Sequence, residues 1–276
     1  MSPTEDSPRE LLRLEHHALA EENTRAALVT LDRPESLNAI DLPLLQQLDA
    51  CLDEVDADPS VRCLLVTGAG RAFSAGGDLK GYIALQRDPV AFPHFVAELH
   101  RIFGRLRALR VPAVALVNGV TAAGGLELLL ACDFAVAARS ARIGDAHLNF
   151  GQMGGGGVLT LLPRLVGWQR ATQLIFSGEL LSAEDACAWG LVSEVVEDEG
   201  LLAAGLAFAG SVARKSPLAV ANAKAVMREA WEQRLPMEAS LRLERDTNSH
   251  YCLTSEDAPE GLAAFSEKRA PRFVGR

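Results

Sequence analysis

The stretch Val111–Ala138, "VPAVALVNGVTAAGGLELLLACDFAVAA", decides the fold class. It is the longest apolar tract in the chain, but Asn118, Glu127 and Asp133 interrupt it and glycines divide it into short pieces. A membrane-spanning helix needs about 20 consecutive, predominantly apolar residues. The tract therefore predicts a buried strand, a glycine turn, a helix and a second buried strand.

The same alternation of strand and helix extends toward the N-terminus. Residues 26–32, "AALVTLD", and residues 61–68, "VRCLLVTG", are short apolar runs typical of buried strands. Asp41 can cap a helix whose leucines recur at helical spacing, and residues 95–109 have the apolar spacing of a second helix. Strands that alternate with helices predict an α/β core.

Toward the C-terminus the pattern changes. From about Gly151 few strand signals remain, and beyond Asp198 the sequence has helical character almost to its end. We therefore expect an α/β core with the functional site over residues 1–197 and a helical region over residues 198–276.

Composition and charge narrow the function classes. The net charge is −9 and the pI is near 5.2, which argues against a general binder of nucleic acid or of anionic membranes. A phosphorylated ligand held by a few local cations is still compatible with this charge. The N-terminus, "MSPTEDSPRELLRLEHH", lacks the cationic start and apolar core of a secretory signal.

Cysteine usage points to a reducing compartment. The chain has five cysteines, widely spaced and without a CxxC pair. This pattern favours neither a zinc site nor a disulfide framework, and it fits a cytoplasmic protein.

The segment "NGVTAAGGLELLLACD" (118–133) carries the first chemical signal. A strand ends, a glycine-rich turn follows, and a helix starts near Gly124, where backbone N–H groups are unsatisfied and the helix dipole is positive. Glu127 lies three residues further on, on the same helix face. A carboxylate beside an anion-stabilising terminus suggests a reactive site, although a Glu that caps its own helix explains the pattern equally well.

A second glycine-rich loop, "GRAFSAGGDLKGY" (70–82), follows a predicted strand. Its small residues allow another backbone N–H to approach a ligand, and Asp78 could cap the next helix. A tight loop without any ligand remains the alternative. The run "MGGGG" (153–157) lacks the GK[ST] ending of a phosphate-binding loop, and no dinucleotide fingerprint occurs.

Together these segments resemble the enoyl-CoA hydratase/isomerase (crotonase) superfamily. The likeness is carried by "GAGRAFSAGGDLK" (68–80) and "NGVTAAGGLELLLACDFAVAA" (118–138). It continues in "LDRPESLNAID" (31–41), in "LPRLVGWQRATQLIFSGELLSAEDACAWGLVSEVV" (162–196) and in "AFSEKRAPRF" (264–273). It covers nearly the whole chain after about residue 10.

The resemblance implies a spiral of ββα units with a helical C-terminal trimerisation region, and hence a homotrimer or homohexamer. It also implies an acyl-CoA thioester as substrate and no cofactor or metal beyond the CoA moiety. In such proteins two backbone N–H groups hold the thioester oxygen as it becomes an enolate. By position these belong to Gly77 and Gly124, in the two loops that the residue pattern had already singled out.

The family's contacts with CoA can also be carried over. They match Ser36 and Leu37 in "RPESLNA" and Ala75 beside the first oxyanion donor. The contacts with adenine and phosphate match Phe265 and Lys268 in "AFSEKR", and a neighbouring subunit could supply them. Without the resemblance, this segment would be interpreted as a solvated basic tail.

The family's hydratases use two glutamates. One matches Glu127; the other falls at His147 in "IGDAHLNFGQ" (143–152), which we expect to be a short extended segment. A histidine can still move protons near neutral pH. Asp145, two residues away on the same side of such a segment, could orient it. A purely structural histidine remains the alternative.

Reversible hydration of a 2-enoyl-CoA is the function that these residues predict. Glu127 would activate water, His147 would orient it or share the proton transfer, and Gly77 and Gly124 would stabilise the enolate. Isomerisation of the double bond, hydrolysis by water activated at Glu127 or His147, and a non-catalytic acyl-CoA binding protein remain alternatives.

Overall fold

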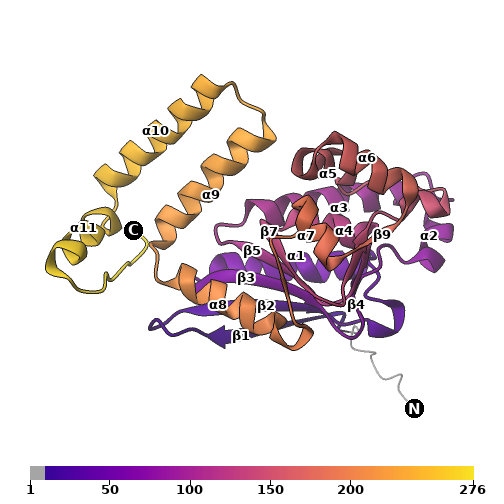
Figure 1. The fold of residues 1–276 in the computed structure, drawn as a ribbon, viewed down its shortest axis with the longest axis horizontal. Coiled ribbons are helices and arrows are strands. Elements are labelled where there is room, and N and C mark those ends of the chain that lie inside the picture. The colour runs from indigo at the N-terminus through magenta and orange to yellow at the C-terminus, as the bar shows by residue number, and fades with distance from the viewer. Residues whose placement is uncertain (1–9) are drawn as a thin grey trace, which may run out of the picture.

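The structure is a computed structural model that describes residues 10–276 (Figure 1). The first nine residues of the polar N-terminal segment lie outside the described residues. Strand β1 (Leu12–Ala18) forms the edge of a six-stranded sheet and pairs antiparallel with β2 (Arg25–Leu31). The other strands of this sheet run parallel, in the order β1-β2-β3-β5-β7-β10. Their bounds are β3 (Val61–Gly68), β5 (Ala113–Val117), β7 (Phe134–Ala138) and β10 (Glu194–Val196).

A second sheet of four short strands continues from the first. Three of its strands follow directly after a strand of the large sheet: β4 after β3, β6 after β5, and β8 after β7. Each pair of strands leads into a helix, which is the repeated ββα unit expected from the resemblance. The bounds are β4 (Ala72–Ser74), β6 (Val120–Ala122), β8 (Arg142–Gly144) and β9 (Leu180–Ser182), of which β9 is antiparallel to β8.

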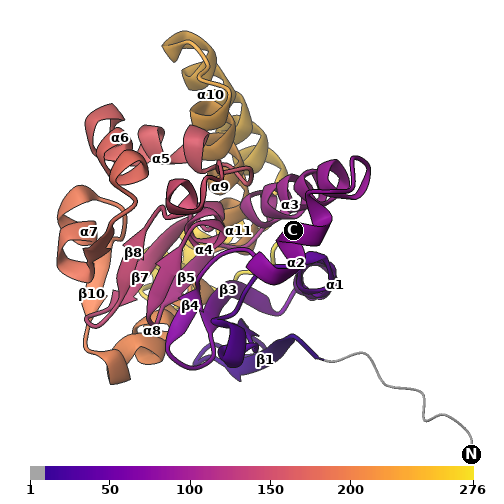
Figure 2. The same ribbon diagram turned by 90° about the vertical axis from the view of Figure 1, so that its right-hand side faces the viewer.

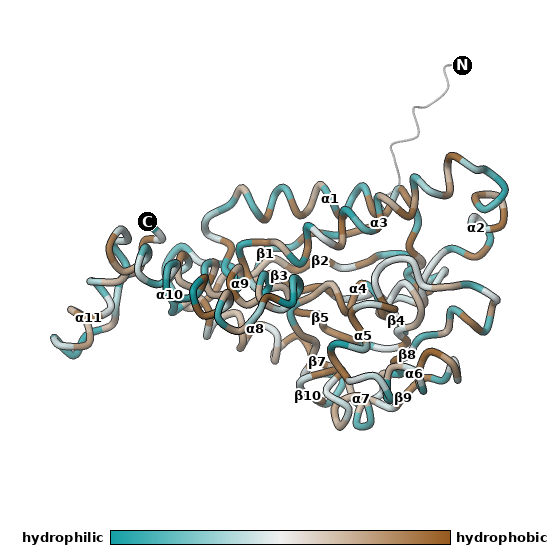
Figure 3. The backbone as a smooth tube through the Cα atoms, turned by 90° about the horizontal axis from the view of Figure 1, so that it is seen from above, coloured by the Kyte–Doolittle hydropathy of each residue, from teal (hydrophilic) through white to brown (hydrophobic). Residues whose placement is uncertain are grey.

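Both faces of the large sheet are covered. Helices α1 (Leu42–Ala57) and α3 (Ala91–Ala108) pack on one face through side chains that alternate with solvent-facing residues, as the mixed hydropathy along these helices shows (Figure 3). Helix α8 (Leu201–Ala213) covers the other face. Because both faces are buried, the central strands are apolar at almost every position.

Local signals in the sequence explain where the helices begin and end. Asp41 accepts a hydrogen bond from the backbone N–H of Leu44, with Pro43 in the first turn of α1. Gly190 adopts a left-handed conformation and ends the helix α7 (Ala183–Trp189). The start of α1 at Asp41 agrees with the prediction.

The C-terminal helices project away from the core (Figures 1 and 2). Helix α9 (Pro217–Glu232) buries only Lys224, whose ammonium bonds Asp133 and a backbone carbonyl of the core. Helix α10 (Met237–Thr254) buries no residue, and α11 (Asp257–Glu267) buries two. A helical C-terminal region is thus present, and most of its surface is uncovered in one chain. The remaining helices are α2 (Leu79–Leu85), α4 (Gly124–Ala131), α5 (Val158–Val166) and α6 (Trp168–Ser177).

Residues 10–276 contain neither a membrane-spanning helix nor a cluster of metal-binding side chains. None of the helices there is both long and apolar enough to cross a membrane. The same residues contain no group of three or more His, Cys, Asp or Glu side chains arranged to hold a metal ion.

Candidate active site

A cavity of about 690 Å³ lies where three of the ββα units turn from strand to helix. It brings together segments that are far apart in the sequence: the loop before α1, the loops after β4 and β6, helix α3, and the segment after β8. The residues that matter here are Ser36, Leu37, Ala75, Gly77, Tyr82, Val96, Leu99, Gly124, Glu127 and His147.

Two backbone N–H groups are free on one side of this cavity. Gly124 is the first residue of α4 and Gly77 follows β4. Neither N–H has an acceptor within the described part of the chain. A Cβ atom added to Gly124 would lie 3.7 Å from the amide nitrogen of Gly77, so the two donors are close neighbours.

Glycine is required where these two loops touch. A Cβ atom at Gly125 would lie 2.0 Å from the carbonyl oxygen of Ser74, and one at Gly76 would lie 2.8 Å from the Cβ of Ala123. Ala123 itself has φ 49° and ψ −118°, a conformation that costs of order 1–3 kcal/mol for a non-glycine residue. The backbone is therefore held in a strained, closely packed arrangement that sets the direction of the Gly124 N–H.

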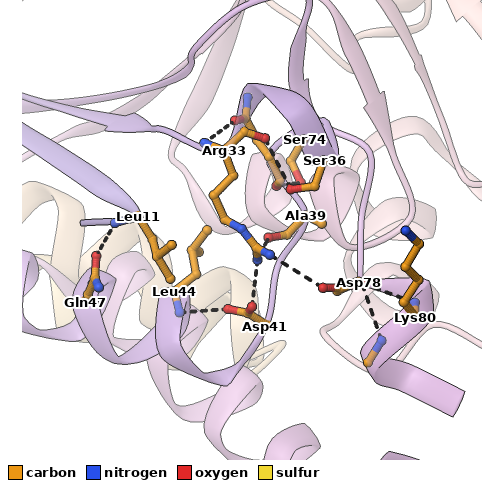
Figure 4. A network of polar contacts seen from close by, with 12 residues as sticks. Leu11, Arg33, Ser36, Ala39, Asp41, Leu44, Gln47, Ser74, Asp78 and Lys80 are labelled. Atoms are coloured by element: carbon orange, nitrogen blue, oxygen red, sulfur yellow. Dashed lines mark hydrogen bonds and ion pairs between the residues drawn. The ribbon is translucent and has the colours of Figure 1, made fainter. Parts of the chain in front are cut away.

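The loop before α1 fixes the Gly77 side (Figure 4). Arg33 donates hydrogen bonds to Asp41 and to the carbonyl of Ala39, and its guanidinium lies 3.5 Å from Asp78. Asp78 caps α2, as the sequence predicted.

Buried Ser74 also joins the loop before α1 to the loop that carries Gly77. Its hydroxyl donates to the carbonyl of Asn38 and accepts from the N–H of Gly76. The N–H of Ala75 donates to the carbonyl of Leu37 at 2.9 Å. The segment expected to contact CoA is therefore bonded directly to the loop that carries Gly77.

Glu127 forms the other side of the cavity. Its side chain is 1 % exposed, and its Oε1 accepts hydrogen bonds from the N–H groups of Gly156 (2.6 Å) and Val158 (3.3 Å). Glu127 therefore does not cap its own helix. Burial raises the pKa of this carboxyl, although the charge of His147 and the two backbone hydrogen bonds act in the opposite direction.

The glycine run 153–157 makes room for this carboxylate. A Cβ atom at Gly156 would lie 2.6 Å from Glu127 Oε2, and one at Gly154 would lie 3.1 Å from Glu127 Oε1 and 3.5 Å from His147 Cε1. The run thus surrounds a side chain instead of a phosphate.

His147 lines the same cavity as Glu127, with its side chain 15 % exposed. The prediction of an extended segment was wrong here. Only Arg142–Gly144 is extended, and His147 begins a short 3-10 helix, His147–Phe150, after a turn at Ala146. The turn still brings His147 Nδ1 within 2.5 Å of Asp145 Oδ1.

The charge state of His147 depends on its neighbours. Burial lowers the pKa of the imidazole, but the hydrogen bond and charge of Asp145, together with the charge of Glu127, outweigh it and raise the pKa overall. The cavity therefore holds two acid–base groups whose ionisation is mutually dependent.

The residues expected to contact CoA fall into two groups. Ser36, Leu37 and Ala75 line the cavity together with Gly77. Phe265 and Lys268 do not. Phe265 is 86 % exposed on α11, which Figure 1 shows far from α2.

Sequence analysis missed several residues that shape the site. Ser74 and Asn38 are fully buried and bond the two loops together, and Arg33 joins α1 to α2. Tyr82 packs over Gly77 and is near enough to Glu127 that burial and this charge raise the pKa of its hydroxyl. The sequence signals for them were the positions of Arg33 and Asn38 in the motif "LDRPESLNAID" and of Ser74 and Tyr82 in the loop "GRAFSAGGDLKGY".

Known proteins resemble this chain over nearly its whole length. The family model described as enoyl-CoA hydratase/isomerase matches residues 21–276. The chain belongs to the enoyl-CoA hydratase/isomerase family. It is 37 % identical over 256 residues to the 2,3-dehydroadipyl-CoA hydratase of Escherichia coli, covering 91 % of this chain and 96 % of that protein. It is 33 % identical over 261 residues to the crotonyl-CoA hydratase of Syntrophomonas wolfei, covering 94 % and 98 %.

A solved structure extends the likeness to three dimensions. The crystal structure of an enoyl-CoA hydratase from Bacillus anthracis matches with a TM-score of 0.89 at 30 % identity, covering 97 % of this chain and all of that one. The fold is therefore the crotonase fold, as the sequence predicted.

Proposed function

We propose that this protein is an enoyl-CoA hydratase that adds water reversibly to the double bond of a 2-enoyl-CoA. The observation that carries the proposal is the buried carboxylate of Glu127, which shares one cavity with the unpaired N–H groups of Gly77 and Gly124. The hydratase names of two relatives at 33 % and 37 % identity support the same reaction.

The two amides would bind the thioester carbonyl oxygen. As water adds to the β-carbon, negative charge moves onto this oxygen, and donors that are already in place stabilise it without reorganisation. The strained backbone at Ala123 and the close glycine contacts keep the two N–H groups in position before substrate arrives.

Glu127 and His147 would divide the proton transfers. Glu127 as carboxylate takes a proton from the attacking water, whose oxygen bonds to the β-carbon. His147 as imidazolium gives a proton to the α-carbon, and the proton on Glu127 then returns to His147. One water is thereby added, and both side chains recover their starting state.

In this proposal His147 takes the place of the family's second glutamate. Its position on the cavity wall and its contact with Asp145 support a proton-transfer role. A neutral histidine with no acidic partner would be a weaker acid–base candidate.

The CoA moiety would lie along Ser36, Leu37 and Ala75, with Phe265 and Lys268 contributed by a second subunit. We propose a homotrimer or homohexamer, because α9–α11 expose many large apolar side chains that a single chain leaves uncovered. These are Met227, Trp231, Met237, Leu241, Leu253, Leu262 and Phe265. No cofactor beyond CoA is part of the proposed reaction. A cytoplasmic location is also proposed, supported by the five free cysteines.

Turnover of crotonyl-CoA and of longer 2-enoyl-CoAs tests the proposal, followed by the loss of the enoyl-thioester absorbance. We expect hydration by the parent protein and its loss in Glu127→Gln. Release of free thiol would instead identify a hydrolase, and a shifted double bond an isomerase. Binding without turnover would identify a carrier.

A further inference from the structure

Asp145 is an unusual carboxylate. Its side chain is 1 % exposed, and its Oδ1 lies 2.5 Å from His147 Nδ1. Its other oxygen, Oδ2, is buried and has no hydrogen-bond partner within the described residues. No backbone N–H group and no arginine or lysine bonds this carboxylate there, so His147 is its single partner.

Such an arrangement has an energetic cost that needs an explanation. A buried carboxylate without full hydrogen bonding is destabilising, and a structural carboxylate would normally cap a helix or pair with a cation. Asp145 caps no helix and bonds no arginine or lysine within the described residues, although it stands one residue before a turn where an Asx cap would be available; its partner is His147. Its placement is explained if the carboxylate acts on His147.

Contact at Nδ1 also decides which nitrogen is available for chemistry. A neutral histidine carries its proton on one ring nitrogen, and an acceptor at Nδ1 keeps the proton there. The Cε1 edge faces Gly154, and the ring lines the cavity. Nε2 is therefore the nitrogen left to face the substrate.

We propose that Asp145 is a positioning residue for catalysis: it fixes the ring of His147 with Nδ1–H toward itself and Nε2 toward the substrate. This rests on the proposed hydratase function and refines it. Asp145 keeps His147 able to donate from Nε2, and it makes position 147 specific for histidine.

The charges around the ring explain this specificity. The titratable groups that face His147 or its partner in the cavity are Asp145, Glu127 and Tyr82. A cationic imidazole between two carboxylates is favourable. A glutamate at position 147 would place a third carboxylate beside Asp145 and Glu127. Asp145 and His147 therefore form a matched pair.

A double-mutant cycle tests the pairing. The variants are Asp145→Asn, His147→Glu and the double variant Asp145→Asn/His147→Glu, with Asp56→Asn at the exposed end of α1 as a matched surface control. We expect Asp145→Asn to lower kcat by about 10²–10⁴-fold with little change in KM, in the range of a general acid–base contribution. We expect His147→Glu alone to be similarly poor and the double variant to be more active than either single variant.

The pH profile gives a readout that a merely structural role would not move. Asp145→Asn removes the main group that raises the pKa of His147, so the alkaline limb of kcat should move to lower pH. An unmoved limb, or a double variant that simply adds the two losses, would overturn the proposal. Thermal unfolding of each variant identifies any that lose activity only by unfolding.

An NMR measurement separates this inference from the proposed reaction. In the parent, imidazole nitrogen shifts should report the Nδ1–H tautomer and a titration above the reference value of histidine; Asp145→Asn should lose both. If the parent does not hydrate enoyl-CoAs but the tautomer depends on Asp145, the proposed function fails and the positioning role stands. If the tautomer is independent of Asp145, the positioning role fails.

Discussion

The two sides of the cavity present different groups: backbone N–H groups on one side and ionisable side chains on the other. The side with Gly77 and Gly124 is made of backbone, held by glycine contacts and by the buried side chains of Ser74 and Asn38. The opposite side depends on the ionisable side chains of Glu127 and His147. In our proposal the first side follows the family's pattern, whereas the second departs from it at position 147. The difference teaches that the first side is set by backbone packing, whereas the second depends on the ionisation of two side chains.

Removal of the Glu127 charge should have the largest effect. Glu127→Gln keeps the shape of the side chain but cannot accept a proton from water, so we expect kcat to fall by about 10²–10⁴-fold. Steady-state hydration of crotonyl-CoA measures this, with Glu199→Gln on the surface as control. A loss below tenfold would show that the backbone side alone carries most of the catalysis.

Disruption of the backbone side should come next. Gly125→Ala forces a methyl group against the carbonyl oxygen of Ser74 and pushes the Gly124 N–H away from Gly77. Loss of one oxyanion donor costs about 10²–10³-fold in kcat. Gly210→Ala in α8 is the matched control, because nothing lies within 4 Å of its added methyl group. Equal activity of both variants would contradict the assignment of the donors.

The pH dependence should be bell-shaped and set by the side-chain side. Glu127 must be ionised, so the rate rises with pH through its raised pKa. His147 must be protonated, so the rate falls as pH passes its own raised pKa. The optimum then lies between these two macroscopic values. His147→Gln should lose the alkaline limb in a kcat profile from about pH 4 to about pH 10, a range that brackets both reference values.

Protonation of His147 should also change the free energy of unfolding with pH. Because the folded state raises the pKa of His147, its protonation stabilises the fold below the unfolded pKa, and this contribution is lost as pH rises through the folded pKa. Urea unfolding of the parent and of His147→Gln across this range measures the difference. A pH-independent difference would be inconsistent with a charged His147.

Ser74→Ala should give the smallest effect on catalysis. It leaves the N–H of Gly76 and the carbonyl of Asn38 without their hydroxyl partner in a buried position. We expect a loss of about 1–3 kcal/mol in the free energy of unfolding and less than about tenfold in kcat. Urea unfolding and steady-state kinetics measure the two. A kcat loss as large as that of Gly125→Ala would mean that this hydroxyl, and not glycine packing, orients the donors.

Much of the fold was predictable because its signals are local. Short apolar runs and the Asp41 cap predicted strands and a helix start that agree with the structure. The conformation around His147 was not predictable, because the turn at Ala146 has no strong local signal. The hydrogen-bond partners of Glu127 were not predictable either, because its two donors lie about thirty residues away in sequence.

The sequence by itself determined the α/β class, the alternation of strands and helices and the two glycine-rich loops, while the ββα order and the residues at the family's reactive positions were expectations from the resemblance. These depend on periodicity, on turn chemistry and on motifs that are contiguous in the chain. Tertiary structure alone decided that Glu127 bonds the glycine run instead of capping its helix, that Asp145 is buried against His147, and that Phe265 and Lys268 lie away from the cavity of their own chain. The physical reason is that burial and hydrogen-bond partners are set by contacts between distant segments, and no local pattern of residues records them.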